Sequence, residues 1–432
     1  MNDRAALELL LEHGPLSRSR IGSLTGLSKP TASQLLARLE TAGLVVATGT
    51  AGGRPGPSAQ LYALNARAAY VAGLDVTPAR ITAAVADLAG RVAGSCDLPT
   101  PVPGSGPAPA SVVVGQVTEA LDRAASAAGL DRSGIHRLAV ATPGAFDPRT
   151  GRLRYADHLP GWHSPTLLEE LAAALPMPVA YENDVNLAAV AEQRLGAARG
   201  HRDFVLLWNE AGLGAALVLG GRLHRGWTGG AGEVGFLPVP GRPLVRGVRA
   251  LNSGGWQELA GVRAVAALAA GLGIDPAGAG SGAGPGDGSG PGRGAGDPVA
   301  VAVALLARAA ARPEGPHLEL LRRYATALAT GLASLVSVLD PEIVVLSGAV
   351  NAAGGAVLRE LTAAELAELA PSSPRLITGE VRERPVLRGA LESALATTRD
   401  EVFDTSGSSP VGSSPASRTA GRPHRTPGRA ST

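Results

Sequence analysis

Apolar residues recur every three or four positions through the first 43 residues, a spacing that predicts amphipathic helices. Gly14-Pro15, Gly26 and Gly43 interrupt this spacing and mark helix ends. The pattern predicts three helices, over 4–13, 17–26 and 29–42, followed by two strands, over 44–48 and 60–64. Three helices followed by a hairpin are the plan of a winged helix-turn-helix domain.

The third of these helices carries side chains that DNA recognition needs. Small polar residues at its N-terminal end can reach base edges in a major groove, and its first N–H groups can hold phosphate. A basic residue in the loop between the strands can reach the minor groove or the DNA backbone. We expect DNA contacts from Ser28, Lys29, Thr31, Ser33, Gln34, Arg38 and Arg54. The pattern alone also fits a protein-interaction or dimerisation module.

From residue 70 onward, short apolar runs alternate with helical spacing, which predicts a two-lobed α/β body. Strands are expected over 71–76, 81–88, 91–97, 138–141, 205–208, 215–219 and 343–346. Helices are expected over 111–129, 166–175, 185–195, 256–270, 299–311, 317–339 and 356–370. The predicted organisation is a winged-helix domain over 1–66 and an α/β domain over 67–400, with a disordered insert at 275–298 and a disordered tail over 401–432.

Composition narrows the classes of protein that remain. Hydrophobic residues make up 45% and charged residues 18% of the chain, so most of it can bury a core. A net charge of +2 excludes a broadly polybasic nucleic-acid coat, and the single cysteine, Cys96, excludes an intramolecular disulfide and a multi-cysteine zinc site. Neither a signal peptide nor an apolar run of about 18 residues is found, which predicts a soluble cytoplasmic protein without membrane contact.

Two segments combine carboxylates with amides or glycines. Glu182-Asn183-Asp184 precedes a predicted helix, where a carboxylate could accept a hydroxyl proton from a polyol and an amide could bond neighbouring hydroxyls. Spacing alone favours an ordinary helix N-cap at this point. The glycine-rich run 229–235 holds Glu233, and it fits either a close approach of backbone to a ligand or a surface turn.

The run GLSKPTASQLLARLETAGLV, with Gly-Arg-Pro in the wing, resembles the DNA-binding domain of the ROK family (repressor, ORF, kinase). Three further runs resemble the sugar-kinase-like body of the same family in the same order: ATPGAFDPRTGRLRYADHLPGWHSPTLLEEL, PVAYENDVNLAAVAE and GRLHRGWTGGAGEVG. The similarity spans about 3 to 400 without the insert. It implies an actin-like, two-lobed ATPase fold after the winged helix, and it is nearest to sugar-responsive repressors of the xylose and N-acetylglucosamine type.

The resemblance also implies roles for individual residues. Asp184 stands where the family kinases keep their catalytic base, and Asn183 and Glu233 stand at sugar-hydroxyl contacts. Gly144 and His158 belong to the same implied sugar pocket, although His158 replaces the asparagine that family sugar binders carry.

The chain departs from the family pattern at the ATP and zinc sites. The first phosphate loop, Gly-Gly-Thr in the kinases, follows Asp75 here as 77–80, Thr-Pro-Ala-Arg, and the second, Gly-Thr-Gly, is 210–212, Glu-Ala-Gly. Ser-Gly-Ala at 347–349 is a weaker departure at the adenosine end. Phe236 replaces the zinc-binding histidine, and 251–256 contains no cysteine. We expect neither ATP nor zinc as a cofactor, no metal site and no catalysis, with Asp184 a vestigial base.

Three functions remain open. The first is a regulator, acting as a repressor, that binds operator DNA as a homodimer or homotetramer and responds to a sugar or sugar phosphate. The second is an active sugar kinase with an accessory DNA-binding domain, which the retained Asp184 favours. The third is a DNA-bound scaffold with a vestigial pocket, which Phe236 and His158 favour.

Overall fold

The computed structural model describes residues 2–50, 59–100, 109–147, 150, 152–154, 159, 161, 162, 164, 166–242, 244, 254–275 and 297–404. The predicted sites at Arg54 and His158, most of the predicted insert and the tail from 405 lie outside the described residues. The chain divides into two compact units, residues 1–65 together with 400–432, and residues 66–399.

The first unit is three helices and a small sheet. Its elements are α1 (Asn2–His13), β1 (Leu16–Ser17), α2 (Arg18–Thr25), α3 (Lys29–Thr41), β2 (Val45–Thr50) and β3 (Gln60–Leu64). The strands form an antiparallel sheet in the order β1-β3-β2, in which Leu16 pairs with Tyr62. The predicted winged helix is therefore confirmed, whereas β1 was not predicted because two residues are too short to show an alternating pattern.

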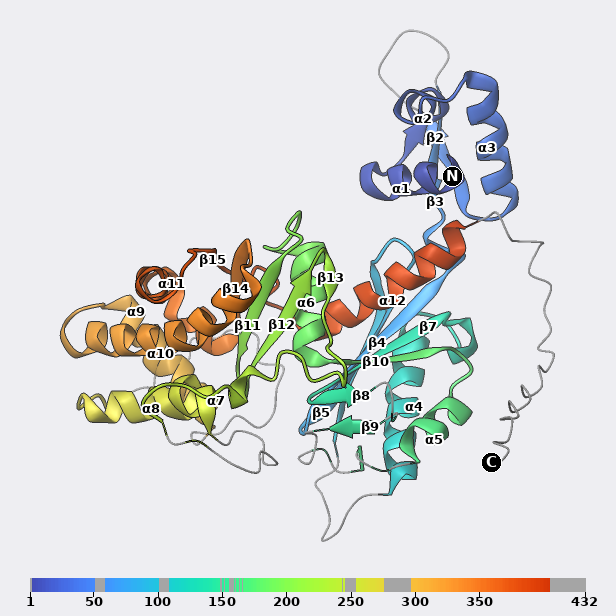
Figure 1. Cartoon of the computed structure of the whole chain (residues 1–432). Coiled ribbons are helices and arrows are strands. Elements are labelled where there is room, and N and C mark those ends of the chain that lie inside the picture. Colours follow the sequence, from blue (N-terminus) through green and yellow to red (C-terminus); the bar gives the residue numbers. More distant parts are fainter. Residues whose placement is uncertain are drawn as a thin grey trace, which may run out of the picture. The chain divides into compact units, whose positions relative to one another are not determined.

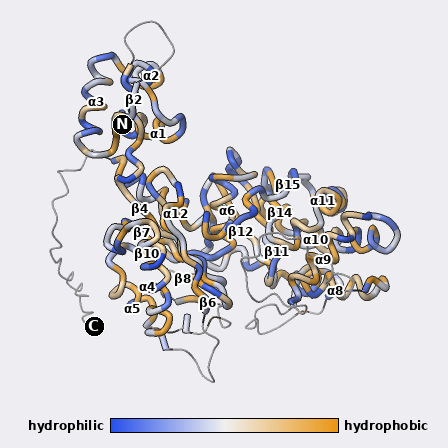
Figure 2. Tube along the Cα trace, turned by 180° about the vertical axis from the view of Figure 1, so that it is seen from behind, coloured by the Kyte–Doolittle hydropathy of each residue, from blue (hydrophilic) through white to orange (hydrophobic). Residues whose placement is uncertain are grey.

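Local chemistry fixes where α2 and α3 begin. The Ser17 side chain accepts the N–H of Arg20 at the start of α2, and the Ser28 side chain accepts the N–H of Thr31 at the start of α3. α2 ends at Gly26, whose φ of 71° is in the left-handed region that glycine adopts without strain. Hydrophilic and hydrophobic residues alternate along α3 (Figure 2).

The second unit is built on two five-stranded sheets (Figure 1). The first has the order β10-β7-β4-β5-β6. Its strands are β4 (Tyr70–Val76), β5 (Arg80–Asp87), β6 (Val92–Pro99), β7 (Arg137–Thr142) and β10 (Val179–Asn183). Helices α4 (Ala110–Ala127) and α5 (Leu167–Ala174) cover one face of this sheet and share a hydrophobic core with it. A short hairpin of β8 (Ala145–Asp147) and β9 (Arg152–Arg154) follows β7.

The second sheet has the order β13-β12-β11-β14-β15. Its strands are β11 (Phe204–Asn209), β12 (Leu213–Leu219), β13 (Arg222–Leu223), β14 (Ile343–Ser347) and β15 (Arg375–Thr378). One face carries α7 (Gly255–Ala260), α8 (Val262–Gly271), α9 (Pro298–Ala311), α10 (Gly315–Leu339) and α11 (Ala349–Leu369). Helices α6 (Asp184–Leu195) and α12 (Pro385–Phe403) share a third core with residues of both sheets, so they lie between the two lobes (Figure 1).

Several helices differ from the predicted ones at glycines. The helix predicted over 256–270 is two helices, α7 and α8, because Gly261 is extended, with φ −75° and ψ 176°. α11 begins at Ala349 rather than 356, and Gly355 breaks its helical dihedrals with φ 59° and ψ −152°. The start of α9 lies at the edge of the predicted insert, where the Asp297 side chain accepts the N–H of Val299.

The C-terminal part of the body holds two elements that the sequence pattern did not predict, β15 and α12. α12 continues to Phe403, three residues beyond the predicted domain end at 400, and Phe403 is only 2% exposed. No described helix is long and apolar enough to span a membrane.

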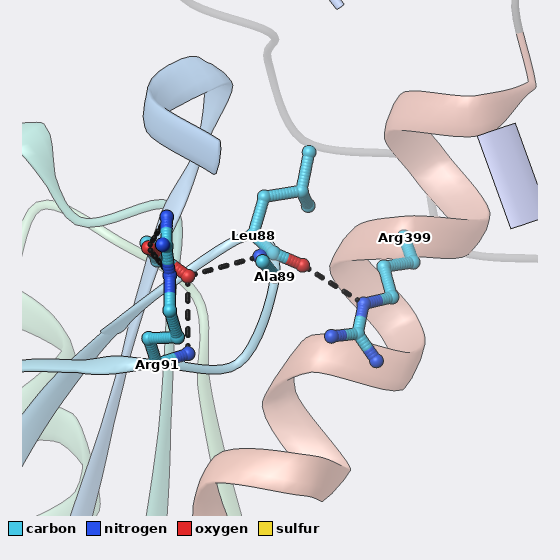
Figure 3. Close-up of polar contacts among 5 residues, drawn as sticks. Leu88, Ala89, Arg91 and Arg399 are labelled. Atoms are coloured by element: carbon cyan, nitrogen blue, oxygen red, sulfur yellow. Dashed lines mark hydrogen bonds and ion pairs between the residues drawn. The ribbon is translucent and has the colours of Figure 1, made fainter. Parts of the chain in front are cut away.

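The turn between β5 and β6 is bonded to α12 (Figure 3). Asp87 Oδ1 accepts the N–H groups of Ala89 and Arg91, each at 3.0 Å, which closes the turn. Arg399 Nε, from the last turns of α12, donates to the Leu88 carbonyl at 3.0 Å. Burial lowers the pKa of Arg399, and the carbonyl is one of the groups that satisfy its guanidinium. This contact joins the first sheet to α12.

Candidate functional site

The N-terminal end of α3 is open to solvent. Ser28, Lys29, Thr31 and Gln34 are exposed, and Ser33 is half-buried. The apolar stripe of the same helix is buried in the unit and comprises Ala32, Leu35, Leu36 and Leu39. α3 therefore presents most of the predicted DNA-contacting side chains on one accessible side.

Arg38 lies apart from these residues. It is in the last turn of α3, and a rise of about 1.5 Å per residue puts it on the order of 13 Å along the axis from Lys29. Arg38 Nη2 bonds Asp3 Oδ1 of α1 at 2.5 Å. The structure thus gives Arg38 a partner within the unit, and it leaves the predicted DNA contact untested.

A residue that the sequence pattern did not single out stands beside α3. Arg18 Nη1 donates to Ser33 Oγ at 3.1 Å, and Arg18 Nη2 donates to the Tyr62 hydroxyl at 3.4 Å. The contacts join α2, α3 and β3. Ser33 is 15 positions and Tyr62 is 44 positions away from Arg18 in the sequence. No local periodicity could have indicated these contacts.

In the body, the segment predicted to bind a polyol forms the junction between β10 and α6. Asn183 is the N-cap of α6, where its Oδ1 accepts the N–H of Asn186 at 3.1 Å, and its Nδ2 donates to the Gly144 carbonyl at 3.0 Å. The N-cap interpretation is therefore correct for Asn183, and the structure brings it together with Gly144. Asp184 follows as the first helical residue, and its Oδ1 accepts the N–H of Val185 at 2.8 Å.

Asp184 feels the charges of three other carboxylates, Asp75, Glu233 and Glu210. Burial, the largest cause, raises the pKa of Asp184 to about 7, and the charges of Asp75, Glu233 and Glu210 also raise it. Burial and the charge of Glu210 raise the pKa of Asp75 to about 6. Burial raises the pKa of Glu233. A carboxylate that titrates near neutral pH can accept a proton from a hydroxyl group.

Glu182, which precedes Asn183, forms an ion pair with Arg225 that the sequence did not predict. Arg225 Nε donates to Glu182 Oε2 at 2.6 Å, and Glu182 Oε1 accepts from the Asn186 side chain at 2.8 Å. Arg225 precedes the glycine-rich loop, and its carbonyl accepts the N–H of Ala231 at 3.1 Å. The ion pair therefore connects the start of α6 with the loop that carries Glu233, across 43 positions of sequence.

The glycine-rich loop packs directly on other backbone segments. A Cβ on Gly229 would lie 2.1 Å from the Phe146 carbonyl oxygen, and one on Gly232 would lie 2.0 Å from that of Ala215. Both glycines also have positive φ, of 78° and 96°. Close backbone approach explains these glycines, which lie in half-exposed turns. The approach of this loop to a ligand stays a prediction.

Comparison with known proteins identifies the family. The ROK family profile matches residues 71–397, and the MarR family profile matches residues 3–54. The chain belongs to the ROK family. Its first unit is a MarR-type winged helix-turn-helix, a DNA-binding domain, and its second is the two-lobed, actin-like ROK fold, so the predicted fold class is confirmed.

Both kinases and regulators are among the relatives of this ROK protein. A glucokinase of Streptomyces coelicolor is 29% identical over 303 residues, which cover 66% of this chain and 84% of the relative. A putative xylose repressor of Caldicellulosiruptor sp. is 22% identical over 369 residues, which cover 84% and 86%. The crystal structure of a ROK family transcriptional regulator, a homologue of the E. coli MLC protein, is 20% identical, with a TM-score of 0.67 and coverage of 93% and 97%; this likeness shows the fold.

The turn after β4 stands where ROK kinases have their first phosphate loop, according to the resemblance. Here Thr77 N–H donates to the Arg80 carbonyl at 2.9 Å, and Arg80 N–H donates to Thr77 Oγ1 at 3.2 Å. Pro78 has no N–H. Two of the four backbone donors are thus used inside the turn, and a third is missing.

The resemblance also assigns the second phosphate loop of the ROK kinases to the turn between β11 and β12. The Ala349 N–H, at the first residue of α11, donates to Glu210 Oε1 at 3.3 Å. A Cβ on Gly348 would lie 2.5 Å from the Asn209 carbonyl oxygen, so the start of α11 packs directly on this turn. A helix N-terminus attracts negative charge, and here the protein's own carboxylate takes that position.

Phe236, Trp162 and Trp227 are aromatic residues of the body that differ in their exposure and surroundings. Phe236 belongs to a short 3₁₀ turn, Val234–Phe236, that follows Glu233. Trp162 is 6% exposed and packs in the hydrophobic core of the first sheet, whereas Trp227 is 78% exposed. Among the described residues, no three His, Cys, Asp or Glu side chains are grouped as a metal site requires. The absence of zinc and ATP stays a prediction.

Proposed function

We propose that this protein is a sugar-responsive transcriptional regulator, acting as a repressor, whose kinase-like body binds its effector without phosphorylating it. The observation that carries the proposal is the Glu210 carboxylate on the N-terminal N–H of α11. An ATP phosphate approaching this point would meet a fixed negative charge, and like charges repel strongly where water is scarce.

The first phosphate loop supports the same conclusion. Backbone N–H groups are the usual cradle of a phosphate at a strand-to-strand turn. In the turn at 77–80, Thr77 and Arg80 donate their N–H groups internally, and Pro78 has none to offer. Productive ATP binding would require this turn to open.

The polar groups around α6 support the binding of a sugar or sugar phosphate. Asp184 and Glu233 supply carboxylates for hydroxyl groups, with Asn183, Gly144 and His158 as further contacts. Two of the relatives are named as a xylose repressor and a putative xylose repressor, which is in line with a sugar effector. We infer that ligand binding changes the affinity of a homodimer or homotetramer for operator DNA, which requires the ligand to bind the two states with different affinity.

An active sugar kinase is the second candidate, and one observation favours it. Asp184, at the position of the kinase base, has a pKa raised to about 7, which suits proton transfer at neutral pH. The glucokinases among the relatives are in line with this alternative. A regulator that binds a sugar hydroxyl through Asp184 would retain the same residue.

Fluorescence anisotropy separates the candidates. The purified protein would be titrated onto labelled DNA from upstream of its own gene, at fixed salt because phosphate contacts make affinity salt-dependent. A panel of sugars and sugar phosphates would follow, with and without MgATP, and ADP would be assayed in parallel. We expect one sugar to release the DNA with no ADP formed.

Each other outcome of these assays would support a different function. Sugar-dependent ADP formation that Asp184→Asn abolishes would establish the kinase and overturn the regulator proposal. Sequence-specific DNA binding that no sugar alters would favour a scaffold with a vestigial pocket. Absence of specific DNA binding would reject both DNA-bound functions.

A further inference from the structure

Arg18 is an exposed cation beside α3, the helix predicted to contact DNA. It is the first residue of α2, and its guanidinium contacts Ser33 of α3 and Tyr62 of β3. A long, flexible arginine that bonds to two other elements loses side-chain entropy before any ligand arrives. It is therefore pre-organised at the surface.

The contacts of Ser33 limit what that residue can do. Ser33 Oγ donates its proton to the Lys29 carbonyl at 2.8 Å and accepts from Arg18 at 3.1 Å. A hydroxyl has one proton and two lone pairs, so one acceptor position remains. Ser33 cannot donate to a base without breaking a bond within α3.

Arg18, in contrast, keeps donors available. A guanidinium has five N–H groups, and the contacts with Ser33 and Tyr62 use one on each terminal nitrogen. Within the described residues, no carboxylate forms an ion pair with Arg18, whereas Arg38 is bonded to Asp3. Its positive charge is thus not neutralised by a neighbouring side chain.

We propose that Arg18 binds a phosphate of the DNA backbone, and that Ser33 and Tyr62 are positioning residues that hold its guanidinium for this contact. The proposal rests on the proposed function, since it assumes that the first unit binds DNA. Ser33 and Tyr62 each accept from one terminal nitrogen, so two bonds within the unit fix the orientation of the guanidinium. A phosphate oxygen can accept from the N–H groups that remain. Ser33 therefore acts through Arg18 rather than as a reader of base edges.

The salt dependence of DNA affinity tests the phosphate contact. The full-length protein, Arg18→Ala and Ser33→Ala would be titrated onto operator DNA and onto scrambled DNA at several salt concentrations. Loss of one phosphate contact reduces the slope of log affinity against log salt by about 0.9. We expect that reduction for Arg18→Ala, with a loss on the order of tenfold on both DNAs. An unchanged slope would overturn the phosphate contact.

A double variant tests the positioning role. Ser33→Ala keeps the arginine charge, so we expect weaker binding with the wild-type slope. In the Arg18→Ala background, Ser33→Ala should then cause no further loss, because its effect passes through Arg18. Additive losses, or a Ser33→Ala loss confined to the operator, would show that Ser33 reads bases and would overturn the assignment.

Tyr62→Phe and a folding control complete the design. Tyr62→Phe removes one hydroxyl and leaves the charge of Arg18 in place, so it should behave as Ser33→Ala does. Thermal unfolding of each variant distinguishes a lost contact from a lost fold. If the wild-type protein binds neither DNA, the proposed function fails together with this inference; if it binds normally and Arg18→Ala changes nothing, this inference fails alone.

Discussion

Two half-buried carboxylates, Asp184 and Asp75, have pKa values raised towards neutral pH. Asp184 has an ordinary pKa of 3.8 that burial raises to about 7, and Asp75 is raised to about 6. A folded-state pKa above the unfolded value means that the folded protein holds the proton more tightly. The stability from this effect is complete below about pH 4 and is lost as the pH rises towards 7.

Asp184→Asn should remove most of that dependence. The amide is close in shape and carries no charge. The variant should therefore gain about 2 kcal/mol over the wild type at pH 8, after allowance for the solvent that reaches this half-buried residue. Urea unfolding between pH 4.5 and pH 8 would measure it. Equal slopes of stability against pH in the two proteins would show that Asp184 ionises normally.

Glu192 is a buried carboxylate with a structural task. It is 0% exposed and accepts the N–H groups of Ala197, Val381 and Glu380 at 2.8, 2.9 and 3.2 Å. Glu192→Ala would leave these donors unsatisfied, and we expect the free energy of unfolding to fall by about 3 kcal/mol. Chemical denaturation would measure this, with the exposed Glu119→Ala as control. A loss equal to that of the control would mean that water replaces the carboxylate.

At the scale of elements, the glycine-rich loop offers a matched pair of variants. A Cβ on Gly232 would overlap the Ala215 carbonyl, whereas one on Gly230 would meet Thr228 Oγ1 at an ordinary 3.5 Å. Gly232→Ala should displace Glu233 and weaken sugar-induced release from DNA at least tenfold, with DNA affinity unchanged. Gly230→Ala should respond as the wild type does. Anisotropy with the effector checks both, and similar behaviour of the pair would exclude a role for loop geometry.

The sequence predicted elements well where amphipathic spacing was regular. Helices such as α4, α6 and α10 lie within a few residues of their predicted ranges. α7 and α8 were merged because nothing local reveals that Gly261 is extended. β15 was not predicted because it is only four residues long. α12 was not predicted because it is stabilised by packing between the two sheets rather than indicated by its own pattern.

The candidate site was predictable in part for a similar reason. Asp184 and Asn183 are neighbours in sequence, and a family resemblance marked them. The pairs Glu182–Arg225 and Arg18–Ser33 join residues 43 and 15 positions apart, so they follow from the tertiary fold. The sequence marked Glu210 as a departure from the second phosphate loop of the family, but its bond to the start of α11 required the structure.

At the scale of the whole molecule, the DNA-binding unit is not continuous in sequence. It includes the described residues 400–404. Arg4 of α1 bonds Asp400 at 2.5 Å, and Phe403 in the same segment is 2% exposed. The end of α12 therefore completes a domain whose other residues come from the first 65 positions.

A pair of truncations tests this dependence. A chain ending at 399 loses Asp400 and Phe403, and burial of a phenylalanine is worth about 2 kcal/mol, so the winged helix should unfold more easily and bind DNA more weakly. A chain ending at 404 should bind as the full chain does. Sugar binding, measured by calorimetry, should be the same in both. Equal DNA affinity of the two truncations would show that the first 65 residues suffice.

The split domain has a genetic consequence. A frameshift or stop codon just before codon 400 spares every codon of the helix that faces DNA and every codon of the sugar pocket. Its phenotype would nevertheless be that of a lost repressor, and a mutation mapped to the far end of the gene would be scored as a regulatory-domain allele. Excising the first 65 codons to make a minimal DNA-binding fragment would fail for the same reason, unless the codons for the end of α12 were joined to it.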